Sequence, residues 1–337
     1  MSEPVEGRTP RDDGFAMPAE WAPHQATLIA WPTRTRTDLW GELFDDAQRE
    51  YAAVANAIAD FEPVVMVADP SQEAEARTFL AAGVELLPVP IDDSWIRDSG
   101  PIFVTDGTGR IAAVDFGFNG WGGRYTPYDR DDALPAALAS HFGMARYEAP
   151  LVLEGGAITV DGEGTLLSTA SCLLNPNRNP GRSRDEVDVI LRDYLGAEVV
   201  VWFPNGWSQT RDTDGHIDGI ALFTGPARLL LLAPADPSDP DFPGSQINRG
   251  VLASTPDAQG RTIEVVALDP GSEVDIPYVN IYLGNGFAIV PAGTPADEVV
   301  HAQVAAAFPD RVIVQVPARI LHEGGGGPHC ITQEVPA

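Results

Sequence analysis

Apolar and polar positions along this chain form a pattern that recurs. A stretch with the apolar spacing of an amphipathic helix is followed by a break, a short apolar strand and a polar or glycine-rich turn, and a second apolar strand usually comes next. This unit recurs about five times along the sequence. Short apolar strands that alternate with helices predict an α/β architecture.

The predicted elements follow from this pattern and from signals at their ends. Ser183 and Glu186 form a capping box, and Gly196 ends the helix that they begin. Predicted helices cover residues 38–60, 71–83, 131–142, 183–196, 246–254 and 294–308. Predicted strands cover residues 27–31, 84–89, 101–104, 149–153, 157–160, 198–203, 217–223, 262–268, 287–290 and 312–316. We expect the N-terminal strand and helix to complete a ring with the C-terminal strands.

The repetition favours one fold over another. About five similar units are typical of radial repetition, as in a propeller, with the turns gathered around one central site. The alternative is an open doubly wound sheet, but no G-x-G-x-x-G motif follows the first predicted strand. No linker divides the chain, since the Pro- and Asp-rich stretch 234–244 is short enough for a surface loop. We expect a flexible segment over residues 1–16 and a single domain over residues 17–337.

The charge of the chain limits its partners. The 337 residues carry a formal net charge of -28. A polyanion of this size repels nucleic acids and anionic membranes and attracts small cations, so we expect neither nucleic acid nor membrane as a partner. The alternative explanation of the charge is that acidity only keeps the protein soluble or suits a salty environment.

Residue types that are rare or absent exclude several chemistries. All 21 basic residues are arginine, which excludes Schiff-base lysines, pyridoxal-phosphate attachment and a P-loop lysine. Two cysteines are too few for a disulfide scaffold or a structural zinc site. Residues 1–14 lack the apolar core of a signal peptide, and no apolar run is long enough for a membrane span. We expect a cytoplasmic protein.

The turns of successive units hold one thiol, one imidazole and three carboxylates. These side chains are Cys330, His216, Asp98, Glu154 and Asp218. If the units surround one axis, the five side chains converge. A thiol, an imidazole and several carboxylates are the groups that nucleophilic catalysis with proton transfer requires.

Cys330 is the candidate nucleophile. It follows four glycines at 324–327, and glycines let the backbone approach a ligand closely, so Gly325 and Gly326 are candidate substrate contacts. A thiol becomes nucleophilic where nearby positive charge stabilises its thiolate. The alternative is a buried, small apolar residue, and we favour that alternative for Cys172, which lies in the apolar stretch 166–174.

His216 and Asp218 are the candidate acid–base pair. The sequence His216-Ile217-Asp218 has the alternation of a strand, which would point both polar side chains to one face. An imidazole beside a carboxylate is suited to proton transfer. Metal binding fits poorly, because no other candidate stands at a ligand spacing such as His-x-x-x-His. The alternative for His216 is a structural, hydrogen-bonding histidine.

The carboxylates in the other turns fit a planar cation. Asp98 lies in the polar turn 92–100 near Trp95, and Glu154 stands between an apolar strand and two glycines, where a carboxylate needs a partner. The alternatives are ordinary turn chemistry for Asp98 and a core position for Trp95. Two opposed carboxylates can each accept a forked pair of N–H bonds from a guanidinium group. The sequence therefore predicts a thiol hydrolase of small guanidinium compounds.

Several motifs resemble the agmatine deiminase family, which also takes in the bacterial peptidyl-arginine deiminases. The motifs are MPAEW from Met17, WIRDSGP from Trp95, FNGWGG from Phe118, EGG from Glu154, GHID from Gly215 and GGGGPHCITQ from Gly324. They run in the same order from about Met17 to the C-terminus. The resemblance implies the pentein fold, a five-bladed β/α propeller. It also implies hydrolysis of agmatine to N-carbamoylputrescine and ammonia, without a metal or an organic cofactor.

The resemblance implies a role for each matching residue. Cys330 would form an amidino-cysteine intermediate, and His216 would act as acid and base. Asp98 and Asp218 would hold the guanidinium group, and Glu154 would support His216 and the substrate. Because related enzymes are often dimers, the resemblance also implies a homodimer.

The sequence departs from the family pattern in places that bear on the substrate's tail. Gly327 stands where the family often has Asn, and Gly219 stands where an Asn usually follows His-x-Asp. The segment after Trp121-Gly122-Gly123 is shorter than in typical agmatine deiminases. By the resemblance, Trp95 would line the pocket.

An acidic pocket favours a substrate with an amine tail. The candidate groups for that amine are Asp212, Asp214 and Glu20. Arg97 and Arg124 could instead serve a substrate carboxylate, unless they pair with local residues such as Asp93 and Asp129.

Three other functions stay open at this point. The same chemistry could act on free arginine, methylated arginine or peptidyl arginine. An amine could replace water, which would make the protein an amidinotransferase. A pentein could also bind the ribosome without catalysis, but a charge of -28 disfavours ribosomal RNA as a surface.

Overall fold

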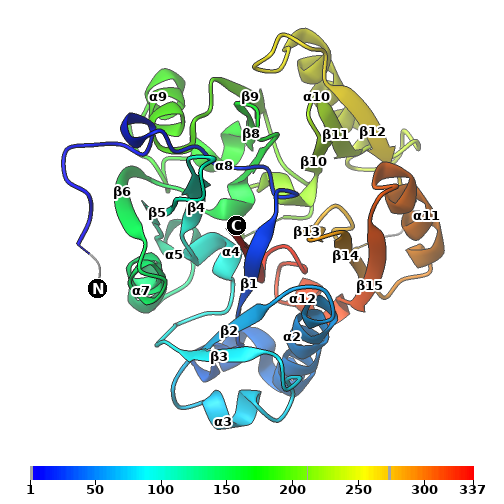
Figure 1. The fold of residues 1–337 in the computed structure, drawn as a ribbon. Coiled ribbons are helices and arrows are strands. Elements are labelled where there is room, and N and C mark those ends of the chain that lie inside the picture. The colour runs from blue at the N-terminus through cyan, green and yellow to red at the C-terminus, as the bar shows by residue number, and fades with distance from the viewer. Residues whose placement is uncertain (1–2, 211, 272–274) are drawn as a thin grey trace.

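The computed structural model of the chain describes residues 3–210, 212–271 and 275–337. Within these residues the strands form five separate sheets, which lie around a common centre (Figure 1). One sheet has the order β16-β1-β2-β3, with strands Thr332–Pro336, His24–Ala30, Val64–Ala68 and Glu85–Pro88. The others are β4-β5-β6 (Ile102–Thr105, Ile111–Gly117, Ala145–Val152), β7-β8-β9 (Ile158–Val160, Thr165–Thr169, Val199–Phe203), β10-β11-β12 (Ala221–Gly225, Arg228–Leu232, Glu264–Leu268) and β13-β14-β15 (Tyr282–Gly284, Phe287–Ala292, Val312–Pro317).

The sheets repeat one topology. In each, the first strand is antiparallel to the central strand, and a helical crossover leads from the central strand to a parallel neighbour. The crossover helices lie toward the outside of the molecule (Figure 1) and are α2 (Phe44–Ala59), α7 (Leu134–His141), α9 (Arg184–Leu195), α10 (Phe242–Ser254) and α11 (Asp297–Ala307). Each helix can therefore bury its apolar face against the sheet that it connects.

Short helical segments occupy many of the connections. The α-helical ones are α1 (Thr37–Trp40), α3 (Glu73–Ala76), α4 (Ile96–Ser99), α5 (Gly120–Gly123), α6 (Asp129–Asp132), α8 (Ala170–Leu173) and α12 (Arg319–Glu323). Single turns of 3-10 helix are η1 (Arg11–Asp13), η2 (Arg34–Arg36), η3 (Gly41–Leu43), η4 (Gly155–Ala157) and η5 (Ile217–Gly219). Among the described helices, none combines the length and the apolar character needed to cross a bilayer.

The recurring unit predicted from the sequence matches this repetition, but each predicted unit spans parts of two neighbouring sheets instead of one whole sheet. Each predicted unit started at a helix and joined the last strand of one sheet to the first strand of the next. The predicted turns are therefore the connections between sheets. The expected closure of the ring is confirmed, because β16 pairs with β1 in the antiparallel direction, with Thr27 opposite Glu334.

The signals at the ends of α9 operate as predicted. The Ser183 side chain accepts a hydrogen bond from the backbone N–H of Glu186, and the Glu186 side chain accepts one from the backbone of Ser183. Gly196 closes the helix in the left-handed conformation, at φ 76°. The helix is thereby fixed at both ends, as the sequence predicted.

The helix predicted over residues 71–83 is wrong, because only Glu73–Ala76 is α-helical. The backbone beyond it bonds to α2 instead of continuing the helix. The Asn56 side chain on α2 donates to the carbonyl of Phe79 at 3.1 Å and accepts from the N–H of Ala81 at 2.7 Å. These bonds occupy the peptide groups that another helical turn would have used.

Residues 4–16, expected to be flexible, make defined contacts. The N–H of Val5 donates to the carbonyl of Arg146, and the N–H of Ala16 donates to the carbonyl of Thr105. Phe15 is buried, and its ring packs against Tyr147. These contacts attach the segment to the sheet β4-β5-β6 and do not support the expected flexibility. The domain boundary at residue 17 stays a prediction.

Candidate active site

The candidate site residues stand on the connections between sheets. Each connection runs from the last strand of one sheet to the first strand of the next. Trp95 and Asp98 follow β3, Glu154 follows β6, His216 and Asp218 follow β9, Asn280 follows β12 and Cys330 follows β15. All five connections therefore contribute to one place.

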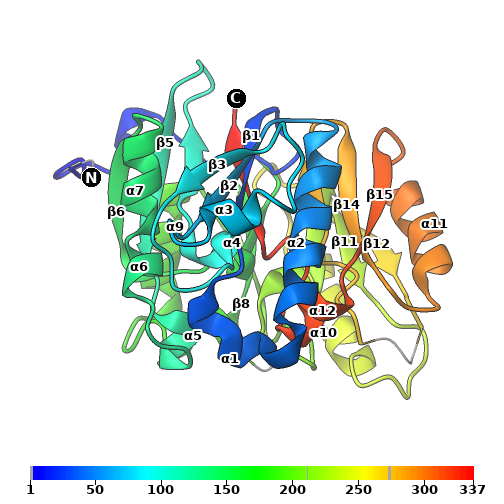
Figure 2. The ribbon, with the colours of Figure 1, turned by 90° about the horizontal axis from the view of Figure 1, so that it is seen from below.

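Two adjoining cavities mark that place. A cavity of about 350 Å³ and one of about 30 Å³ share Asp212, Thr213, Gly325 and Cys330. Residues of α1, α5 and α12 line them, and these helices lie at the end of the molecule opposite the C-terminus (Figure 2). Aromatic and acidic side chains line much of the smaller cavity, whereas polar residues make up most of the lining of the larger one. Cys330 thus stands at the junction of the two spaces.

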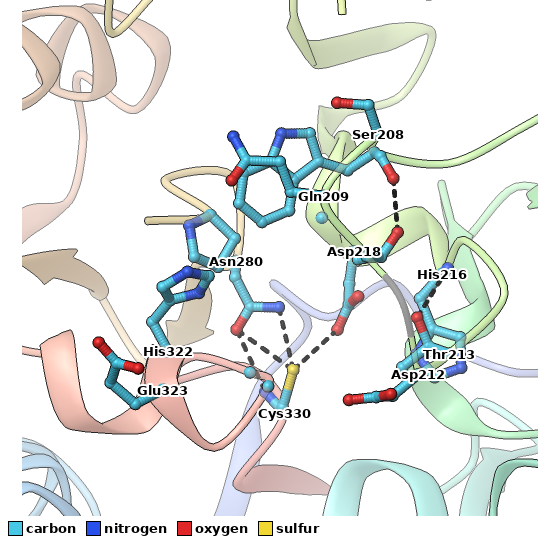
Figure 3. Close-up of a pocket in the computed structure, with 16 residues that line it drawn as sticks. Ser208, Gln209, Asp212, Thr213, His216, Asp218, Asn280, His322, Glu323 and Cys330 are labelled. Carbon is cyan, nitrogen blue, oxygen red and sulfur yellow. Dashed lines mark hydrogen bonds between the residues drawn. The ribbon is translucent and has the colours of Figure 1, made fainter. Parts of the chain in front are cut away.

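The Cys330 thiol lies between an amide and a carboxylate (Figure 3). Asn280 Nδ2 donates to Sγ at 3.2 Å, and Asp218 Oδ2 lies 3.5 Å from Sγ. Burial, together with the negative charges of Asp218 and Asp98, raises the pKa of the thiol well above its ordinary value. The thiol is therefore protonated in the free protein at neutral pH, and a bound cation would favour its ionisation.

Asn280, on the connection between β12 and β13, is a site residue to which the sequence analysis gave no role. Its Oδ1 accepts from the backbone N–H groups of His329 and Cys330 at 3.0 and 3.3 Å. A Cβ on Gly327 would lie only 2.6 Å from that oxygen. The glycine that departs from the family pattern therefore leaves room for Asn280, which fixes the loop carrying the nucleophile.

Asp98 and Asp218 approach the thiol from two sides, since Asp98 lines the smaller cavity and Asp218 lines the larger. Asp98 accepts hydrogen bonds from Trp121 Nε1 at 2.8 Å and from the backbone N–H of Gly156 at 3.1 Å. Burial raises the pKa of Asp98, and the charge of His216 only partly offsets this effect. Trp121 is a further site residue to which the sequence analysis gave no role.

Gly156 shows how closely the polar groups are packed. A Cβ on this residue would lie 2.6 Å from His216 Nδ1, 2.8 Å from Asp98 Oδ1 and 3.0 Å from Asp218 Oδ2. Only glycine fits a backbone that passes so near three side chains. The structure therefore brings His216, Asp98 and Asp218 together around one point.

His216 lies between two carboxylates. Its Nδ1 is 3.8 Å from Asp98 Oδ1, and its Nε2 is 3.6 Å from Glu154 Oε2. Burial lowers the pKa of His216, but the charge of Asp98 and contacts with Cys172 and Glu154 outweigh burial and raise it well above the ordinary value. The imidazole is therefore charged at neutral pH and can donate a proton.

The strand predicted over residues 217–223 is wrong. Ile217–Gly219 is the 3-10 turn η5, and the strand begins only at Ala221. His216 precedes this turn in an extended conformation, while Asp218 lies within it. Both side chains line the larger cavity. The turn, not strand alternation, directs them to one side.

The family model of the Porphyromonas-type peptidyl-arginine deiminases matches residues 16–336. The chain belongs to this family. It is 40% identical to the agmatine deiminase of Pseudomonas aeruginosa strain LESB58 over 369 aligned positions, which cover 100% of this chain and 99% of that protein. The solved agmatine deiminase of Enterococcus faecalis superposes with a TM-score of 0.94 at 32% identity, over 99% of both chains. The resemblance seen in the sequence motifs is confirmed.

The fold is shared more widely than the family. DDAH of Pseudomonas aeruginosa has a TM-score of 0.53 and 14% identity over 93% of this chain and 99% of that one, which shows a common fold alone. The pentein fold predicted for this deiminase family is confirmed.

His329 is a further residue of this family member that the sequence analysis left without a role. Its Nδ1 lies 3.0 Å from Asp218 Oδ2, and its Nε2 lies 3.1 Å from Glu20 Oε2. Burial and the charge of Arg97 lower the pKa of His329, whereas Glu20 and Asp218 raise it, and the net result is about 9. Burial alone would raise the pKa of Asp218, but the charged His329 holds it below its usual value. His329 therefore keeps Asp218 ionised.

The protonation of His329 should make stability depend on pH. Because its pKa rises from 6.5 to about 9 on folding, the stabilisation is complete below about pH 6.5 and is lost as pH rises through about 9. We expect His329→Gln to lower the free energy of unfolding more at pH 6 than at pH 9.5, by about 3 kcal/mol. Urea unfolding at both pH values measures the difference.

The matched control is His141→Gln, since His141 is exposed on α7. Its effect on the free energy of unfolding should be small at both pH values. An equal loss for His329→Gln at pH 6 and pH 9.5 would show that His329 stabilises the deiminase by packing alone.

Glu154 supports His216 from behind and contacts neither cavity. It is fully buried, and its Oε1 accepts from Arg178 Nε at 2.5 Å. Burial would raise the pKa of Glu154, but contacts with His216 and Arg178 hold it below its usual value. The Arg178 side chain is also fully buried, although the polar residues around it are typical of a solvated loop.

The candidates for the substrate's tail divide into two groups. Asp212 lines both cavities. Asp214 lines neither, because it pairs with Arg124 at 2.6 Å and with Arg178 at 2.8 Å. Glu20 is also occupied, with Oε1 accepting from the N–H of Leu283. These contacts favour Asp212 over Asp214 and Glu20, and the residue that binds the tail amine stays a prediction.

The two arginines that could have served a carboxylate are also paired. Arg97 NH1 lies 2.9 Å from Glu334, and Arg124 pairs with Asp214. Their partners differ from those expected. Asp93 instead pairs with Arg36 at 3.0 Å. Neither Arg97 nor Arg124 lines a cavity of this family member.

The glycine loop and Trp95 lie as close to the nucleophile as expected. Gly325 and Gly326 line the larger cavity, and Trp95 lines the smaller. A Cβ on Gly326 would lie 2.5 Å from the Trp95 ring and 3.1 Å from Cys330 Sγ. The backbone of this loop therefore forms part of the cavity wall in the deiminase.

Cys172 is buried, as expected, but its surroundings are polar. Its Sγ lies 3.8 Å from Glu154 Oε2. Burial and the charge of Glu154 raise the pKa of this thiol. The interpretation of Cys172 as a purely apolar residue is therefore wrong, because the stretch 166–174 passes behind the site.

Proposed function

We propose that this chain hydrolyses agmatine to N-carbamoylputrescine and ammonia. The observation that carries the proposal is the position of Cys330 Sγ at the junction of two cavities, with Asp98 facing one and Asp218 facing the other. Buried, opposed carboxylates suit a planar guanidinium group. The relatives named agmatine deiminase support the same reaction.

The first half of the reaction forms a bond between Cys330 and the substrate. The guanidinium group brings positive charge to a site whose carboxylates hold the thiol protonated, so the thiol releases its proton as the cation binds. The thiolate then attacks the guanidinium carbon. His216 donates a proton to one terminal nitrogen, which leaves as ammonia, and an amidino group remains on Cys330.

The second half returns the enzyme to its starting state. Neutral His216 accepts a proton from water, and the water oxygen attacks the amidino carbon. The tetrahedral intermediate collapses to the ureido product and expels the thiolate. The second proton of the water returns to Cys330, and the proton released at the start leaves with ammonia as ammonium.

The roles of the other residues follow from their contacts. Asp98 and Asp218 hold the guanidinium group, and Trp95 and Trp121 line the smaller cavity. Glu154, Arg178 and His329 line neither cavity, so they are positioning residues. No metal and no organic cofactor enters any step of the proposed reaction.

Acidic side chains at the larger cavity favour an amine tail. Asp212 and Glu323 line it, and no arginine among the described residues does; Arg211 lies outside them. An amine gains from nearby carboxylates, whereas the carboxylate of free arginine would be repelled. We propose that Asp212 binds the tail amine, because it borders both cavities.

The substrate is tested by comparing kcat/KM for agmatine, free arginine and a blocked peptidyl arginine on one preparation. Agmatine should exceed both others by at least about tenfold, which corresponds to about 1.4 kcal/mol. Ammonia release measures the rate, and mass spectrometry identifies the product. A preference for arginine or for the peptide would reject agmatine while leaving the Cys330 chemistry intact.

Asp212→Asn tests whether Asp212 binds the tail amine. It should lower kcat/KM for agmatine and leave kcat/KM for free arginine unchanged or higher, since it removes a charge that repels the arginine carboxylate. An equal loss for both substrates would show that Asp212 does not face the tail. The cytoplasmic location and the homodimer expected from the sequence stay predictions.

A further inference from the structure

A sulfur, a nitrogen and an oxygen meet behind the candidate active site. Cys172, His216 and Glu154 each offer one ligand atom, and these three atoms lie within 4.8 Å of one another. Glu154 Oε2 lies 3.6 Å from His216 Nε2 and 3.8 Å from Cys172 Sγ. Two ligands of a tetrahedral zinc ion at ordinary bond lengths lie about 3.4–3.6 Å apart. The two separations that involve Glu154 are therefore close to those of a zinc site, and the third is at most 4.8 Å.

The orientation of the imidazole is a second, independent observation. Nδ1 of His216 faces the carboxylate of Asp98 at 3.8 Å. Nε2 is buried and has no hydrogen-bond partner among the described residues. A carboxylate on one ring nitrogen and a free second nitrogen is the usual arrangement of a zinc-binding histidine.

The charges around these atoms also suit a divalent ion. Arg178 Nε bonds to Oε1 of Glu154, which leaves Oε2 turned to Cys172 and His216. One carboxylate and one thiolate would neutralise Zn²⁺, with a neutral imidazole as third ligand. Thiolate and imidazole favour zinc-like ions over magnesium or calcium.

We propose that Glu154, Cys172 and His216 form a zinc-binding site whose occupation inhibits the enzyme. The ion is an inhibitor and not a cofactor, because it engages Nε2 and withdraws His216 from proton transfer. The existence of the site does not depend on the proposed function, whereas the inhibition rests on it.

The two cysteines of the chain make the binding test decisive. In Cys330→Ser the only remaining thiol is that of Cys172. Addition of Co²⁺ to this variant should give a thiolate-to-cobalt charge-transfer band in the near ultraviolet, and Zn²⁺ should abolish the band by displacement. The matched control is the double variant Cys172→Ser/Cys330→Ser, which should give no band.

Zinc affinity is measured by competition with a fluorescent chelator. Of the three ligand residues only His216 lines a cavity, so the ion should enter slowly and a long preincubation is needed. Cys330→Ser should bind one zinc ion per chain, at least about tenfold more tightly than the double variant. Equal affinity in these two variants, or a cobalt band that requires Cys330, would overturn the site. Thermal unfolding without metal confirms that each variant is folded.

Inhibition is measured separately on active protein. Zinc should inhibit the wild-type enzyme, and Cys172→Ser should need at least about tenfold more zinc for the same fractional loss of its own metal-free rate. Equal sensitivity of the two proteins would place the inhibitory ion elsewhere, for instance on Cys330. If the protein released no ammonia from any guanidino compound, the proposed function would fail, while the cobalt and chelator results would still decide the site.

Discussion

Cys330→Ser should reduce kcat for agmatine by at least about a thousandfold. The bound guanidinium and its surroundings can ionise a thiol, but the pKa of a serine hydroxyl lies too far above that range. Burial and the charges of Asp218 and Asp98 raise the pKa of the Cys330 thiol, so even this thiol ionises only when the cation binds. Ammonia release in single and multiple turnover measures the loss.

The intermediate gives a readout that a structural effect would not produce. Acid quench of the wild-type reaction followed by peptide mass spectrometry should find the amidino group on Cys330. In Cys172→Ser the adduct should still form on Cys330, whatever the effect on rate, since Cys172 lines neither cavity. A Cys330→Ser variant that kept a tenth of the wild-type kcat would refute the proposed nucleophile.

Asp218→Asn and Asp98→Asn should each lower kcat/KM by about 2–5 kcal/mol of transition-state stabilisation, or roughly thirtyfold to several thousandfold. Each change leaves the buried guanidinium group partly unpaired. Asp310→Asn, at an exposed position, is the matched control and should have no effect. The kinetic constants of the four proteins with agmatine provide the comparison.

The same variants should make the Cys330 thiol more reactive, although they slow turnover. Because Asp218 and Asp98 both raise the pKa of Cys330, removing either charge should lower that pKa. Alkylation of Cys330 by iodoacetamide should therefore be faster in each Asn variant than in the wild type at the same pH. Two- or threefold increases in KM with unchanged alkylation would mean that the clamp consists of other residues.

Sequence reasoning located most of the site because the repeating unit placed its turns in register. Asp98, Glu154, His216 and Cys330 stand in corresponding turns, so the assumption of one axis was enough to bring them together. The same register pointed to Asn280, but a single amide in a turn has no chemistry that distinguishes it. Its importance comes from contacts with His329 and Cys330, some 50 positions away.

Other features depend on partners that no local pattern reveals. His329 gains its charge from Asp218 and Glu20, which lie 111 and 309 positions away in the sequence. Arg178 followed a polar stretch typical of a solvated loop, yet it is buried against Glu154. Metal binding was judged by spacing along the chain, whereas Glu154, Cys172 and His216 come from three separate segments.

Several strands were missed, among them β2 and β8. In β2 and β8 all residues are buried, because a helix covers one face and the rest of the molecule covers the other. Such strands have a continuous apolar pattern instead of a period of two, and the sequence alone does not separate them from helix cores. At His216 a strand was predicted where none exists, because the alternation of three residues is too short to distinguish a strand from a 3-10 turn.

The pairing of β16 with β1 has a consequence for how the molecule is made. A ribosome produces β1 among the earliest segments and β16 among the last, so β1 must wait with one edge unpaired while four other sheets are synthesised. Unpaired edges invite association with other chains, and closing so long a loop is slow compared with forming a local hairpin. Since the segment that closes the ring also carries Cys330, the protein acquires its reactive group only when the open edge of β1 is covered.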